Sequence, residues 1–121
     1  MAAYTTIDNP ELYFQVKLYT GTGSENAITL DGDTDMQPDL VWIKCRSDAD
    51  NHPIHDSIRG ATNVVHSDTT DAEYAVAQGL KSFDSDGFTL GTSNFANQSS
   101  RTFVAWCWKA GSAFSNDASA T

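Results

Sequence analysis

The segment at residues 40–46 constrains the fold most, because it begins with apolar residues on both of its alternating faces. A strand that is apolar on both faces belongs in the centre of a covered sheet. Residues 102–109 are the other strongly strand-like segment, with Trp106 and Trp108 on the face opposite to Cys107. We expect these tryptophans to belong to the core, with one of the pair near the surface. The expected buried residues are Trp42, Ile43, Phe88, Val104 and Trp106.

Shorter strands are predicted along the rest of the chain. Alternating or short apolar runs lie at residues 14–19, 27–30, 54–58, 63–66, 80–83 and 88–90. The letters DSDG at 84–87 form a strong hairpin signal between the last two runs. Asp, Asn, Gly, Ser and Thr make up 53 of the 121 residues, which is typical of a chain with many turns.

Helix signals are short and few. Asp8 and Asn9 before Pro10 have the pattern of a helix start, and the letters TDAE at 70–73 spell a capping box. We therefore predict an all-β fold, an antiparallel β-sandwich of the jelly-roll or concanavalin-like kind with one or two short helical turns. The predicted organisation is an N-terminal arm at 1–13, the sandwich at 14–111 and a flexible C-terminal tail at 112–121.

The net charge of −9 excludes some classes of partner. Such a chain cannot neutralise a run of phosphates, so no nucleic acid is expected as a partner. The same charge disfavours docking on anionic membranes, and the apolar runs are too short to span a bilayer. The first residues, MAAY, lack the basic start and apolar stretch of a secretory signal.

Six sequence blocks, in this order, resemble a domain of tailed-bacteriophage virion proteins, found especially in marine phages. The blocks are YTG at 19–21, ITL at 28–30, PDLVWIK at 38–44, DSIRGA at 56–61, SFDSDGF at 82–88 and VAWCWKAG at 104–111. The resemblance covers roughly residues 4–111. In longer relatives the domain is similar to a module of fibre-like or lectin-like structural proteins.

This resemblance implies a non-enzymatic structural protein of the phage particle, assembled in the host cytoplasm and located in the virion. It would act as a capsid decoration or fibre subunit, with other capsid or tail proteins as partners. Phage appendages of this kind are commonly symmetric, so a homo-oligomer is expected, and a trimer above other states. The alternative is a glycan-binding, lectin-like module of a tail fibre that recognises the host surface.

The acids Asp31, Asp33 and Asp35 are the candidate calcium ligands, because alternating acids wrap calcium in many loops. An EF-hand is excluded, because Met36 stands at the sixth position and Trp42 at the twelfth, where glycine and glutamate are required. An ordinary solvated acidic turn is the favoured interpretation. We expect no bound metal and no cofactor.

Three histidines raise the question of zinc, but His52, His55 and His66 lack an evident further ligand beyond Asp56. Surface or packing histidines are the favoured interpretation. The chain also has no G-x-S-x-G motif and no distinguishable pair of carboxylates. We therefore expect no enzyme and assign no catalytic residue.

The candidate binding residues for a glycan or protein partner are Trp108, Arg59 and Asp56. The motif from Asp56 to Gly60 admits a ligand-contacting arginine or a local Asp–Arg pair that fixes the loop. The local pair is the favoured interpretation. The tryptophans likewise admit a sugar-stacking platform or a core role, and the core role is favoured.

The first segment supplies the candidate assembly residues Tyr4, Ile7, Leu12 and Tyr13. An arm with this many apolar side chains should pack on something, and a neighbouring subunit or the chain's own body are the options. We expect residues 1–14 to contact a partner and residues 112–121 to be loosely held. Cys45 and Cys107 lie in strands that could be neighbours, but a reducing cytosol favours free buried thiols.

Overall fold

The computed structural model describes residues 9–110. Along the chain, the elements are η1 (Pro10–Leu12), β1 (Phe14–Thr20), β2 (Asn26–Thr29), β3 (Leu40–Cys45), β4 (Pro53–Asp56), β5 (Asn63–His66), β6 (Tyr74–Ala75), β7 (Leu80–Asp84), β8 (Gly87–Leu90), α1 (Asn94–Asn97) and β9 (Thr102–Trp108). Among the described residues, no helix has the length and apolar character needed to cross a membrane.

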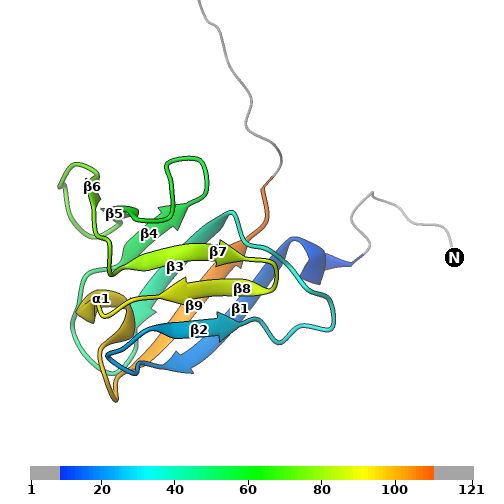
Figure 1. The fold of residues 1–121 in the computed structure, drawn as a ribbon, viewed down its shortest axis with the longest axis horizontal. Helices are drawn as coiled ribbons and strands as arrows, with labels where there is room; N and C mark the ends of the chain where they lie inside the picture. The colour runs from blue at the N-terminus through cyan, green and yellow to red at the C-terminus, as the bar shows by residue number, and fades with distance from the viewer. Residues whose placement is uncertain (1–8, 111–121) are drawn as a thin grey trace, which may run out of the picture.

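The strands form two antiparallel sheets that pack face to face (Figure 1). The larger sheet has the order β1-β9-β3-β4-β5-β6, and the smaller has the order β2-β8-β7. The predicted all-β antiparallel sandwich is thereby confirmed. β3 lies between β9 and β4, so its central placement is also confirmed.

The core lies between the two sheets. The larger sheet contributes the inward residues of β3 and β9, and the smaller sheet contributes Ile28, Leu80, Phe88 and Leu90. Tyr19 closes one side of this core, since its ring stacks on Phe103 with the centroids 5.3 Å apart. Its hydroxyl donates to the carbonyl of Ala96 at 2.7 Å, so the one polar atom of this ring has a partner.

The prediction of the core residues was partly wrong. Ile43 and Phe88 are fully buried between the sheets, as expected. Val104 is buried too, but it belongs to the other side of the larger sheet. Trp42 and Trp106 are only half-buried and share that outer side, so their placement in the core was wrong. The inner side of these strands carries Val41, Ala105 and Cys107 instead, together with Ile43 and Phe103.

The helical turn predicted after Asn9 is present, and the one predicted from the capping box at residues 70–73 is not. Asn9 caps η1 through its side chain, which accepts from the N–H of Glu11 at 3.2 Å. The capping box at residues 70–73 precedes the short strand β6, which pairs with β5, and Glu73 binds Arg59 instead of closing a helical turn. The structure has its other helical segment elsewhere, in α1, which follows β8.

Asn97, at the end of α1, holds several loops together and had no signal in the sequence. Its side chain is fully buried. Its amide nitrogen donates to the carbonyls of Ser24 at 2.6 Å and Gly91 at 2.7 Å, and its oxygen accepts from the N–H of Thr22 at 3.0 Å. These contacts fix the loop between β1 and β2 against the end of β8, because a buried amide must keep its partners.

The two cysteines are free and buried. They lie in neighbouring strands, but the register pairs Cys107 with Val41 and Cys45 with Phe103. Four residues of strand separate the two positions, about 13 Å, which is far beyond the reach of a disulfide. Cys45 and Cys107 therefore cannot bond to each other in this fold.

Candidate functional site

The outer side of the larger sheet is apolar from its β1 edge to β5. The residues of this surface, which we call the aromatic face, are Phe14, Val16, Leu18, Leu40, Trp42, Ile54, Val65, Val104, Trp106 and Trp108. Their side chains point away from the smaller sheet, because each alternates with an inward neighbour along its strand. The larger sheet therefore has an apolar patch on its outer side too, bordered by Thr20, Thr102, Lys44 and Asp56.

The pairing register arranges these side chains in rows that cross the strands. The first row runs Phe14, Trp108, Leu40, Asp56. The second row runs Val16, Trp106, Trp42, Ile54, Val65. The third row runs Leu18, Val104, Lys44. Trp108 and Asp56, which were candidates from the sequence, thus stand in one row with Leu40 between them.

Exposure on the aromatic face increases toward the β1 edge. Phe14 is 37% exposed, Val16 44% and Leu18 55%, while the tryptophans are half-buried. An antiparallel sheet with one side in water normally carries polar residues on that side. An apolar side of this extent is typical of a surface that binds another protein.

The aromatic rings support one another in pairs across the strands. The centroids of Phe14 and Trp108 are 5.1 Å apart, and those of Trp42 and Trp106 are 5.2 Å apart, both pairs tilted. The indole N–H of Trp42 donates to the hydroxyl of Ser67 at 3.1 Å, which satisfies its polar atom. These contacts hold the rings in fixed orientations, so the face is preorganised for a partner.

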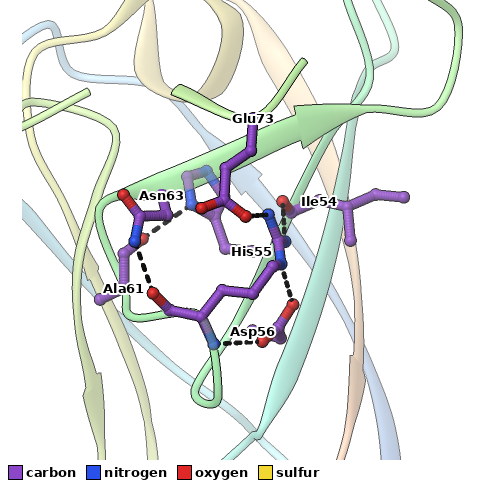
Figure 2. Close-up of polar contacts among 7 residues, drawn as sticks. Ile54, His55, Asp56, Ala61, Asn63 and Glu73 are labelled. Atoms are coloured by element: carbon purple, nitrogen blue, oxygen red, sulfur yellow. Dashed lines mark hydrogen bonds and ion pairs between the residues drawn. The ribbon is translucent and has the colours of Figure 1, made fainter. Parts of the chain in front are cut away.

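A polar cluster around Arg59 borders the aromatic face beside β4 (Figure 2). The carboxylate of Asp56 accepts from the Arg59 backbone N–H at 2.8 Å and from its Nε. The guanidinium also donates to Glu73 at 3.1 Å and to the carbonyl of Ile54 at 3.0 Å. The amide of Asn63 donates back to the Arg59 carbonyl. Figure 2 shows these side chains converging from β4, β5 and the segment before β6.

The charges in this cluster stabilise each other. Partial burial alone would raise the pKa of Asp56, but the hydrogen bonds and charge of Arg59 outweigh it and lower that pKa. Burial likewise opposes the charge of Arg59, while Asp56 and Glu73 raise the pKa of the guanidinium. Asp56 and Arg59 are therefore charged and paired, which is the geometry of a loop-fixing pair. Their contacts support the local interpretation favoured from the sequence.

The acidic loop offers no collected set of metal ligands. Asp31 binds the ammonium of Lys17 at 2.9 Å, and this hydrogen bond lowers its pKa. The N–H of Asp33 donates to Glu11 at 2.7 Å, and Asp35 is exposed. Within residues 9–110, no three His, Cys, Asp or Glu side chains lie together as metal ligands would.

Two of the three histidines, His55 and His66, are packing residues, whereas His52 is half-buried in the loop before β4. His55 and His66 are buried on the inner side of β4 and β5, whereas Asp56 lies on the outer side. The Nδ1 of His55 donates to the carbonyl of Ala61 at 2.8 Å, and the Nε2 of His66 lies 2.8 Å from the hydroxyl of Tyr74. Burial lowers the pKa of His55 to about 4, so this ring is neutral at pH 7.

The candidate assembly residues are only partly described. Tyr4 and Ile7 lie outside the described residues. Leu12, in η1, is half-buried and Tyr13 is 40% exposed. η1 is attached to the body, because the Gln15 amide donates to the carbonyls of Glu11 and Thr34 at 2.9 Å each.

Fold and site together define an antiparallel β-sandwich domain whose larger sheet presents an apolar outer face. The chain belongs to the family described as a domain of unknown function, DUF7483, whose model matches residues 9–121. Neither the comparison with curated proteins nor the comparison with solved structures found a match.

Proposed function

We propose that this chain is a non-enzymatic structural module of a bacteriophage particle, a capsid decoration or fibre subunit that works by assembly. Such a protein would be made and assembled in the host cytoplasm and would reside in the virion. The resemblance of the six sequence blocks supports the phage context. The aromatic face carries the assembly argument, because it is the surface a partner protein would cover.

The dimensions of the aromatic face suit the centre of a protein interface. Its five strands span about 19 Å at a spacing of ~4.8 Å, and its three rows span about 13 Å. With side chains included, this corresponds to roughly 400 Å², half of what one partner contributes to a standard interface. The apolar centre would be surrounded by polar groups, as interfaces usually are. Lys44 and the Asp56–Arg59 pair stand at its border.

The proposed partners are other capsid or tail proteins and further copies of the chain. The trimer implied by the resemblance remains a prediction. Repulsion between copies of net charge −9 requires a contact surface with few acids, and Asp56 is the single acid in the three rows. It is neutralised by Arg59.

The test of assembly is the mass of the purified chain in solution, with variants of the face. Leu18→Lys places a charge on the aromatic face and should release monomers, because a desolvated lysine opposes association. Ile58→Lys is the matched control, since Ile58 is 69% exposed but lies in the turn after β4. Detection of the chain in purified particles tests the phage role. A monomeric chain that is absent from particles would contradict the proposal.

The N-terminal segment has its own test. Deleting residues 2–8 removes Tyr4 and Ile7 and leaves η1 in place. If these side chains contact a partner, the deletion should weaken association. An unchanged assembly would exclude them as contributors.

Glycan binding is the second candidate function, favoured by the exposed Phe14 ring that supports Trp108 at the first row. Aromatic faces stack on sugars, but a sugar site also needs free polar groups to orient its ligand. Both carboxylate oxygens of Asp56 are occupied by Arg59. A glycan array with the wild type and Trp108→Ala separates the two functions. Binding that is lost in Trp108→Ala while assembly persists would favour the lectin role.

A further inference from the structure

The first strand, β1, forms one border of the larger sheet (Figure 1). It pairs with β9 along all seven residues, and among the described residues no strand pairs with its other edge. An edge of this kind carries backbone N–H and C=O groups that can pair with another chain. Pairing of this edge with another chain rests on the assembly function proposed above.

The hydrogen bonds to β9 show which backbone groups point outward. The carbonyl of Tyr13 accepts from Lys109 at 2.8 Å, and the N–H of Gly21 donates to Arg101 at 2.8 Å. In an antiparallel pair, every second residue bonds to the partner strand. Odd-numbered residues of β1 therefore face β9. The N–H and C=O groups of Phe14, Val16, Leu18 and Thr20 face outward.

The side chains of Phe14, Val16 and Leu18 are also the most exposed part of the aromatic face. Sheet edges are usually protected by proline, a bulge or a charged side chain, including one that points inward. β1 contains no proline, and its register with β9 is unbroken. Its one charge, Lys17, points to the inner side and is neutralised by Asp31 at 2.9 Å. An inward lysine can protect an edge, but Asp31 already binds this one, and no strand among residues 9–110 pairs with the edge.

A hollow of about 290 Å³ lies against this edge. It is lined by Phe14 and Val16 from the outer side, by Gln15 and Gly32 from the inner side, and by the acids Glu11 and Asp31, of which Asp31 is paired with Lys17. Residues of both sides of a strand can line one hollow only where the strand ends the sheet. The hollow therefore opens at the free edge of β1, where it leaves room for an added strand.

We infer that two copies of this chain pair antiparallel through β1, which joins their larger sheets and aromatic faces across a two-fold axis. The register follows from the side chains. Centred on Val16, it places Phe14 opposite Leu18 of the second copy and Lys17 opposite Gln15. Centred on Lys17, it would place two like charges opposite each other, which is unfavourable. The favoured register forms about six backbone hydrogen bonds.

The partner is a second copy because the strand is complementary to itself in this register. Apolar side chains meet apolar side chains on the outer side, and β1 itself contains no acid in either copy. The contact makes a dimer, or a larger assembly that contains two-fold axes. Its mass is therefore distinct from that of the trimer implied by the resemblance.

Amide hydrogen exchange on the wild type tests the pairing without any substitution. In the dimer, the outward N–H groups of Val16 and Leu18 should exchange at least ~100-fold more slowly than in the dilute monomer. The N–H groups of Gln15 and Lys17, which face β9, should be protected in both. Equal, fast exchange of Val16 and Leu18 at all concentrations would overturn the pairing.

Val16→Pro tests the same contact by mass. Proline removes an outward N–H and leaves the β1–β9 bonds intact, because it is tolerated at a free edge. The variant should be monomeric, whereas the matched control Val16→Ala keeps the N–H and should remain about twice the 13.1 kDa chain mass. A Val16→Pro chain that stays dimeric would contradict the inference.

Other outcomes separate this inference from the proposed function. A trimer with unprotected Val16 and Leu18 amides overturns the pairing and leaves assembly intact. The chain could also be a monomer in which the Val16 and Leu18 amides exchange fast only after residues 2–8 or 111–121 are deleted. That result would show that the chain's own segment covers the edge of β1, and it would overturn the pairing of two copies. A dimer with protected amides supports the inference even if the chain is absent from phage particles.

Discussion

Stability of this domain should fall in mild acid because of His55. The ring is fully buried, its Nδ1 donates to Ala61, and its Nε2 has no hydrogen-bond partner among residues 9–110. Protonation would place an unpaired charge in the core, next to the positive Arg59 and near His66. Burial, followed by these charges, lowers the pKa of His55 from 6.5 to about 4.

The direction and size of the effect follow from linkage. Between about pH 6.5 and pH 4, the unfolded chain binds a proton at His55 and the folded chain does not. The free energy of unfolding is therefore highest above pH 6.5 and declines as the pH falls toward 4. A pKa lowered from 6.5 to about 4 corresponds to roughly 3 kcal/mol of stability lost across this window. Asp56, whose pKa is also lowered, adds a further loss in stronger acid.

The assay is urea unfolding at a series of pH values, for the wild type and His55→Gln. The variant should be less stable at pH 7, because a buried contact is lost, and its stability should depend less on pH in this window. His52→Gln is the control, since His52 is half-buried and lies before β4. Equal pH slopes for the wild type and His55→Gln would refute the reasoning. So would an NMR titration that places the folded His55 pKa near 6.5.

Three further predictions concern other parts of the molecule. Asn97→Ala should lower the free energy of unfolding by about 3 kcal/mol, because it orphans several buried backbone groups; a loss below about 1 kcal/mol in urea titration would contradict this. Cys45 and Cys107 should resist a thiol reagent in the folded protein and react once it is unfolded, since both are buried and burial raises the pKa of Cys107 to about 12. Rapid labelling under native conditions would argue against it. Millimolar calcium should leave the melting temperature unchanged, because Asp31 is engaged with Lys17; a rise of several degrees would show a calcium site.

The strands could be located from the sequence because their signals are local. Alternation identified β1, and the DSDG letters identified the hairpin between β7 and β8. The helical turn predicted from the capping box at residues 70–73 is absent, and the contacts made instead are not local. Tyr74 and Ala75 pair with β5, and Glu73 binds Arg59, fourteen residues away.

The site was harder to predict because both sides of β3 and β9 are apolar. Alternation separates Trp42 from Val41, but it cannot say which of them meets the second sheet. That choice depends on the smaller sheet, which comes from segments distant in the chain. The row that joins Trp108 to Asp56 depends in the same way on the β9–β3–β4 register.

The position of β9 has a consequence for how the chain folds during synthesis. β9 is the last strand along the described chain, yet it lies between β1 and β3 in the larger sheet. Until residue 108 has left the ribosome, β1 has no neighbour in that sheet and β3 lacks one of its two. Two apolar strands therefore stay incompletely paired until β9 has been made, a period in which aggregation competes with folding. Insertion of a single late strand then completes the sheet, so a peptide of residues 102–110 should restore the fold to a chain that ends before it.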